Sequence, residues 1–186
     1  MFSHSFSPSI LDRLEALEAQ AAIRQVMARY MELCDHLDAA TPMDELGALF
    51  TPDAEWAGKG ARYGAAFGGH QGRDAIVAML DAYRGPTPHF SLNAHFLTSE
   101  SIQVSGAVAT GSWVMLQTST FATGASFLTS ARLSVHFARD KGRWRIARFA
   151  TTNIFSRPVS VWNDPATLPV PNADHPVSHA QGTRRE

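Results

Sequence analysis

Apolar and polar side chains change their spacing about halfway along this 186-residue chain. Over residues 9–38, apolar residues recur every three or four positions, which is typical of an amphipathic helix. The segments 43–50 and 72–85 repeat this spacing over shorter lengths. We therefore predict three helices in the first half, with a strand beginning at TPDAEW (51–56). The glycine-rich segment 57–71 is typical of a loop or a short hairpin.

From His89 onward, β-branched and aromatic residues alternate with small polar ones, which indicates strands. Glycine-containing breaks divide this half into four predicted strands, at about 89–104, 107–121, 126–139 and 143–156. Because the connections are short, the strands must form antiparallel hairpins, and strands this long must bend. The fold class expected is α+β: a cone-shaped, curved antiparallel sheet with the three helices in its concave face, enclosing a cavity.

Length and composition indicate one domain over residues 1–160, followed by an extended tail over 161–186 whose end we expect to be disordered. The net charge of −1 gives no electrostatic reason to bind nucleic acid or an acidic membrane surface. No apolar run is long enough to span a bilayer, and the start of the chain lacks the regions of a signal peptide, so we expect a cytoplasmic protein. The single cysteine, Cys34, rules out an internal disulfide and suggests a packing role.

Two acids lie unusually on the long predicted helix. If residues 20–38 turn about 100° per residue, one broad arc carries the apolar side chains Ile23, Val26, Met27, Tyr30, Met31, Leu33, Cys34 and Leu37. Asp38 falls inside this arc, and Asp35 lies just past its edge. A carboxylate on the buried side of a helix is costly unless it has a partner. His95, on the first predicted strand of the second half, would supply one.

Strand alternation predicts which way His95 points. Phe90, Leu92, Ala94 and Phe96 share a wholly apolar face, whereas Ser91, Asn93, His95 and Leu97 share the other. The face that carries His95 is therefore the natural face for a site. A carboxylate bonded to one ring nitrogen fixes the tautomer and makes the other nitrogen an effective base. The alternative is that His95 is a core histidine and that Asp35 caps a loop.

The order of several segments resembles the SnoaL-like branch of the nuclear-transport-factor-2-like superfamily over roughly residues 15–160. The segments are AIRQVMARYMELCDHLD, LFTPDAEW, GRDAI, the His95 strand and GRWRIARFATTNIF. The greatest similarity is to the lyases of this superfamily, namely scytalone dehydratase, bile acid 7α-dehydratase and hexachlorocyclohexane dehydrochlorinase. The resemblance implies that Tyr30, Asp35 and His95 are catalytic. It ranks Asp35 first, whereas the helical wheel alone favours Asp38 as the acid that orients the histidine.

Further side chains are candidates to contact a substrate, and for the aromatic ones core packing is the competing interpretation. These candidates are Asp38, Trp56, Phe67, His70, Trp113 and Asn153. Asn153 and Arg148 lie on opposite faces of the last strand, so only one of them can point inward. The remaining histidines show no spacing for metal ligands, and no dinucleotide fingerprint occurs. We expect chemistry without a metal or a cofactor.

The function hypothesis is a cofactor-independent lyase of the dehydratase type. In it His95, assisted by Asp35, removes a proton from carbon in a small hydrophobic cyclic or aromatic molecule. The leaving group would be water, a halide or, by carbon–carbon cleavage, formaldehyde. The alternatives are an isomerase or cyclase in the same cavity, and a non-catalytic binding or dioxygenase-like assembly subunit. Apolar residues on the outer sheet face favour a homo-oligomer, either a dimer or a trimer.

Overall fold

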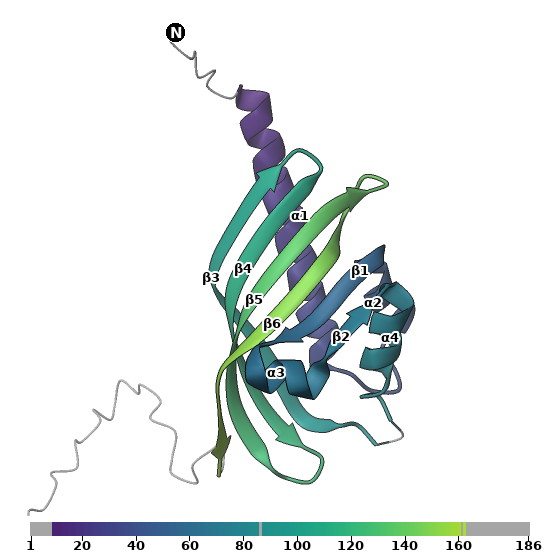
Figure 1. The fold of residues 1–186 in the computed structure, drawn as a ribbon, viewed down its shortest axis with the longest axis vertical. Helices are drawn as coiled ribbons and strands as arrows, with labels where there is room; N and C mark the ends of the chain where they lie inside the picture. Colours follow the sequence, from purple (N-terminus) through teal and green to yellow (C-terminus); the bar gives the residue numbers. More distant parts are fainter. Residues whose placement is uncertain (1–8, 86, 161, 163–186) are drawn as a thin grey trace, which may run out of the picture.

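The structure is a computed structural model that describes residues 9–85, 87–160 and 162. The described residues form four helices and six strands (Figure 1). The helices are α1 (Ile10–Asp35), α2 (Met43–Ala48), α3 (Gly60–Phe67) and α4 (Arg73–Asp81). The strands are β1 (Phe50–Lys59), β2 (Gly69–Gln71), β3 (Phe90–Ser105), β4 (Val108–Phe121), β5 (Ser126–Asp140) and β6 (Arg143–Val159). The expected α+β class is confirmed; the predicted tail lies outside the described residues, apart from Trp162.

All six strands belong to one curved sheet in the order β2-β1-β6-β5-β4-β3. The four long strands pair antiparallel through tight turns, as predicted, and the turn glycines Gly106 and Gly142 have φ angles of 60° and 79°. The expectation of a purely antiparallel sheet is wrong for one pair, because β1 runs parallel to β6. The chain reaches β6 only after the whole meander, so this pairing brings the first strand beside the last.

The glycine-rich segment contains a helix that its composition concealed. Of the two alternatives, a loop or a short hairpin, the structure has an antiparallel pair of strands, β1 and β2, with α3 inserted between them. The described residues thus contain four helices where three were predicted. Gly58 explains the composition: a Cβ atom there would lie 2.2 Å from the carbonyl oxygen of Tyr63. The glycine therefore allows α3 to pack directly against β1.

Helix α1 starts with a capping box in which the Ser9 hydroxyl accepts from the Asp12 amide and the Asp12 carboxylate accepts from the Ser9 amide. The helix crosses the concave side of the sheet (Figure 1), and Ile23, Met27 and Tyr30 are buried there. It ends at Asp35, three residues earlier than predicted. Asp38 consequently belongs to the turn that follows.

The sheet has a closed end and an open end. At the closed end, near the β3–β4 and β5–β6 turns, the inward side chains of Trp113, Val135 and Phe137 are almost fully buried. At the other end, near α3 and α4, the inward side chains leave a cavity. None of the helices in the described ranges is long and apolar enough to cross a membrane.

Candidate active site

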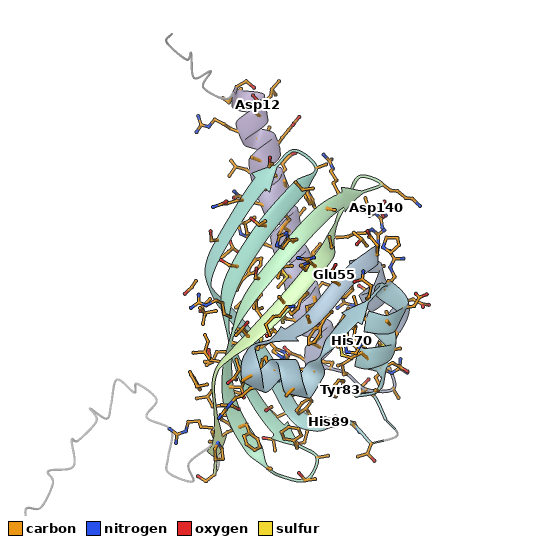
Figure 2. The ribbon with its side chains drawn as sticks, in the orientation of Figure 1. Asp12, Glu55, His70, Tyr83, His89 and Asp140 are labelled. Atoms are coloured by element: carbon orange, nitrogen blue, oxygen red, sulfur yellow. The ribbon has the colours of Figure 1, made fainter. Side chains whose placement is uncertain are left out.

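The cavity at the open end lies between α1 and the concave sheet face and has a volume of about 160 Å³. In Figure 2, Tyr83 and His89 mark this end, and Asp140 marks the opposite end. The wall is mostly apolar and aromatic, with a few polar groups. Its residues come from α1, β1, α3, α4 and strands β3 to β6: Tyr30, Met31, Cys34, Leu37, Trp56, Tyr63, Phe67, Met79, Leu80, Tyr83, Phe90, Asn93, His95, Met115, Gln117, Leu133, Phe149 and Thr151.

Asp35 and His95 are in direct contact at this wall. The Asp35 carboxylate lies 2.6 Å from Nδ1 of His95 and also accepts from the His95 backbone amide, at 3.1 and 3.3 Å. The two side chains are only 17% and 12% exposed. One carboxylate thus holds both the backbone and the ring of His95, so the imidazole has little freedom to turn.

This contact determines which ring nitrogen faces the cavity. A carboxylate accepts hydrogen bonds, so Nδ1 carries a proton, and Nε2 is then the basic nitrogen of the neutral ring. Among the described residues, none hydrogen-bonds to Nε2. Asp35 is also the last residue of α1, where the helix macrodipole places partial negative charge. The carboxylate and the helix end both place negative charge on the Nδ1 side of the ring.

Tyr30 is buried in the same wall, and its hydroxyl accepts a hydrogen bond from Nε1 of Trp56 at 3.0 Å. Because Trp56 can only donate, the hydroxyl proton of Tyr30 remains available to another acceptor. Burial raises the pKa of Tyr30 well above its usual value of 10.0. Tyr30 is therefore a neutral hydrogen-bond donor throughout the physiological range. The ring packs edge-on against Phe149 at 5.1 Å.

Cys34 lies one helical turn after Tyr30 and also lines the cavity. Burial is the main reason that its pKa rises from 9.0 to about 12. A thiol that stays protonated is a poor nucleophile. The structure thus agrees with a packing role for Cys34.

Asn93 and Gln117 add a polar corner beside His95 that the sequence reasoning did not single out as a site. Asn93 is two residues before His95 on β3, and Gln117 is the β4 residue directly opposite His95. Asn93 Nδ2 donates to the Cys34 carbonyl at 3.1 Å, and Gln117 Nε2 donates to Asn93 Oδ1 at 2.8 Å. The corner is therefore connected to the end of α1, next to Asp35.

The structure brings some of the predicted residues to the cavity and leaves others outside it. Tyr30, Trp56, Phe67 and His95 line it, and Asp35 lies behind the wall in contact with His95. Trp56 stacks on Phe149 and meets Phe67 edge-on at 5.7 Å. Four predicted contact residues, namely Asp38, His70, Trp113 and Asn153, are not part of the wall.

Each of these four has another partner. Asp38 accepts from the Ala40 amide in the turn after α1, at 2.8 Å. The His70 ring lies 3.1 Å from the Phe67 carbonyl. Trp113 is buried at the closed end, and its Nε1 donates to Glu100. Asn153 donates to the Phe155 carbonyl at 3.1 Å. On the last strand, Arg148 is exposed and pairs with Glu55 at 2.8 Å.

We found no group of three or more His, Cys, Asp or Glu side chains that could hold a metal ion, in the part of the chain that the structure describes. The arrangement supplies instead a base in Nε2 of His95 and a neutral donor in Tyr30. Both are set in a largely apolar wall. Such a pair suits proton transfer from carbon followed by departure of a neighbouring oxygen.

Comparison with known proteins supports this fold. The family model of the SnoaL-like domain matches residues 15–150. No protein in a search of curated proteins matches the chain. Among solved structures, a hexachlorocyclohexane dehydrochlorinase from Novosphingobium barchaimii superimposes with a TM-score of 0.66 and 19% identity, covering 85% of this chain and 100% of that one.

Two structures from Novosphingobium aromaticivorans are also similar. A protein assigned as a scytalone dehydratase gives a TM-score of 0.64 at 22% identity, over 78% of this chain and 90% of its own. A nuclear-transport-factor-2-like protein with a cystatin-like fold gives 0.61 at 25% identity, over 80% and 92%. Such identities establish the shared fold and leave the reaction to be argued from the site.

Proposed function

The chain belongs to the SnoaL-like domain family, and from this premise we propose that it is a cofactor-independent lyase that uses His95 as general base. The observation that carries the proposal is the 2.6 Å contact between Nδ1 of His95 and Asp35, with the His95 side chain lining the cavity. Elimination from neighbouring carbons needs a base for the proton and stabilisation for the leaving oxygen. His95 and Tyr30 fit these two roles.

In the proposed reaction, Nε2 of His95 takes a proton from an activated carbon, and the electron pair of that C–H bond becomes the new double bond. The hydroxyl on the next carbon leaves with its own electron pair, and the Tyr30 hydroxyl stabilises it by donating a hydrogen bond. The imidazolium then gives the proton to the departing oxygen. The products are an alkene and water, and both residues return to their starting states.

The wall composition favours a small cyclic or aromatic substrate. The cavity presents the rings of Trp56, Phe67, Tyr83 and Phe149, and apolar walls of this kind bind flat apolar molecules by burying their surface. The space of about 160 Å³ is small, which restricts the substrate to one or two rings. A larger ligand requires the wall to open.

The test uses a β-hydroxy cyclic ketone, 4-hydroxy-2-tetralone, whose dehydration gives 2-naphthol. Mass spectrometry follows the loss of one water above the uncatalysed rate. We expect His95→Ala and Asp35→Asn each to lower turnover by about 10²–10⁴-fold with unchanged circular dichroism. Asp38→Asn is the matched control, because this nearby carboxylate accepts from the Ala40 amide, whereas Asp35 contacts His95. It should leave turnover at the wild-type level.

A second measurement tests the base without relying on the leaving group. In D₂O, the wild type should catalyse deuterium exchange at the acidic carbons of 2-tetralone, detected by NMR, and His95→Ala should not. Exchange without elimination would favour the alternative of an isomerase, which returns the proton to carbon. Wild-type exchange and turnover in both variants would disprove the proposal, and so would an equal loss in Asp38→Asn.

A further inference from the structure

The two amides beside His95 have a fixed orientation. A backbone carbonyl can only accept, so the group of Asn93 that faces the Cys34 carbonyl must be its NH₂. Oδ1 of Asn93 therefore faces Gln117, and Gln117 must turn its own NH₂ toward it. The Cys34 carbonyl fixes the order of donors and acceptors in this chain of hydrogen bonds. The order therefore does not depend on which atom of either amide group is assigned as nitrogen and which as oxygen.

One consequence is that Gln117 keeps Oε1 for another partner. Within the described ranges, no donor hydrogen-bonds to this oxygen, and Gln117 lines the cavity directly opposite His95 in the β3–β4 pairing. Nε2 of His95 is an acceptor as well when the ring is neutral. This corner of a largely apolar cavity therefore offers two neighbouring acceptors that are open to a ligand. A ligand that covers them without donating a hydrogen bond would leave an acceptor unpaired, which is costly.

We propose that Gln117 is a specificity-determining residue that accepts a hydrogen bond from a hydroxyl group of the ligand. The preferred ligand is then a ring that carries a free hydroxyl group, and an ether or a hydrocarbon of the same shape is rejected. This inference deepens the proposed function, because it assigns a substrate class to the same cavity. It concerns binding and is independent of whether His95 performs elimination.

The test compares 2-naphthol with 2-methoxynaphthalene, which has a similar shape and no hydroxyl donor. Calorimetric titration should give at least about tenfold tighter binding of 2-naphthol to the wild type, as one hydrogen bond supplies. Gln117→Met keeps the length of the side chain and removes the acceptor, so the preference should fall to near one. Unchanged binding of the ether would show that the variant cavity is intact.

His95→Ala is the second variant, and it separates this inference from the lyase proposal. We expect it to keep the preference for the hydroxyl compound while losing turnover. A preference that survives in Gln117→Met but disappears in His95→Ala would assign the hydroxyl to His95 and overturn the inference. Equal binding of the two compounds to the wild type would also overturn it.

A separate observation concerns the first half of α1, whose first turns extend past the closed end of the sheet (Figure 1). Ile10, Leu14 and Leu17 are 80%, 51% and 61% exposed. Their spacing of four and then three residues continues to Ala21, as at the a and d positions of a coiled coil. At 100° per residue this stripe lies roughly opposite the side of α1 that carries Ile23, so the protein's own sheet cannot cover it.

The charges beside the stripe favour a second copy of the chain in parallel orientation. Arg13 flanks the stripe on one side and Glu18 on the other, at g and e positions five residues apart. In a parallel pair of helices, a g residue faces the e residue five positions further along the partner. Each Arg13 would thus face the Glu18 of the other copy, which gives two such pairs in the dimer. An antiparallel pair would place neither charge opposite its complement.

We propose that two copies of this chain associate through a parallel pairing of this stripe. Analytical ultracentrifugation of the full chain should show a dimer, and Leu14→Glu should give a monomer. Arg13→Glu should weaken the dimer, and adding Glu18→Arg should restore it. The matched control is Phe96→Ser, which removes an exposed apolar side chain from the sheet and should leave the dimer unchanged.

Three results would overturn this second inference. A monomeric wild type would show that the stripe does not pair. Loss of the dimer in Phe96→Ser with a normal dimer in Leu14→Glu would place the interface on the sheet. Failure of the double charge reversal to restore what Arg13→Glu weakens would exclude the parallel arrangement.

Discussion

The closed and open ends of the sheet are made from the same four strands, yet their inward side chains differ in kind. At the closed end, Trp113 and Phe137 meet edge-on at 6.3 Å and leave no space. At the open end, the inward positions of β3 and β4 carry His95, Asn93 and Gln117, and a cavity remains. The same strands pair at both ends, so the size and polarity of the inward side chains separate the packed core from the cavity.

This difference has an energetic meaning. Close-packed apolar side chains stabilise the fold. Polar side chains around a cavity stabilise it less, but they can form contacts with a ligand. The closed end holds the strands in register, and the open end depends on that register for the facing pair of His95 and Gln117. Substitutions at the two ends should therefore affect different quantities.

The largest expected effect on stability comes from Phe137→Ala at the closed end. Phe137 is 1% exposed, and its removal should lower the free energy of unfolding by about 3–5 kcal/mol. Phe67→Ala is the matched control at the open end, where the ring borders the cavity. It should cost less than half as much and should mainly weaken ligand binding. Urea unfolding followed by circular dichroism measures both, and equal losses would contradict the division into two ends.

A smaller effect is expected from Gly111→Ala, also at the closed end. A Cβ atom at Gly111 would lie 2.3 and 2.5 Å from two ring atoms of Trp113, so the indole must move, at a cost of about 1–3 kcal/mol. Gly64→Ala on α3 is the control, because the nearest atom to a Cβ there is 3.9 Å away. Helix propensity should make that variant slightly more stable. Thermal unfolding compares them, and a neutral Gly111→Ala would show that the packing there is loose.

Much of the fold follows from local pattern. The four long strands were predicted to within a few residues, because alternation and turn glycines are local features. The long first helix was also predicted, but its end was not. The helical wheel favoured Asp38 only on the assumption that the helix continues to it. Since α1 ends at Asp35, Asp38 turns away, and Asp35 is the acid that meets His95.

Gln117 shows why the rest of the site needed the structure. Counted back from the β3–β4 turn, His95 would pair with Thr118, on the face of the sheet opposite the one that carries Met115 and Gln117. An irregularity between Thr98 and Ser101 shifts the pairing by one residue, and a shift of one residue exchanges the two faces of a strand. Nothing local in the sequence marks this bulge. Helix α3 was not predicted because its glycines are typical of a loop, and the close approach of Gly58 to the Tyr63 carbonyl becomes visible only in the structure.

The smallest expected effect is a pH dependence that arises at the open end. Burial raises the pKa of the Cys34 thiol from 9.0 to about 12, so the folded chain retains a proton that the unfolded chain releases above pH 9. The unfolded state then binds fewer protons, and the free energy of unfolding falls as the pH rises from about 9 toward 12. Between pH 8 and pH 10 this loss should amount to about 1 kcal/mol.

Urea unfolding of the wild type and Cys34→Ala measures it, since the variant has no thiol to titrate and should show a flatter profile. Keeping below pH 10 limits the contribution of Tyr30, whose unfolded-state pKa is near 10.0. Parallel profiles for the two proteins would mean that water reaches the Cys34 thiol, and the apolar wall of the open end would then not exclude solvent there.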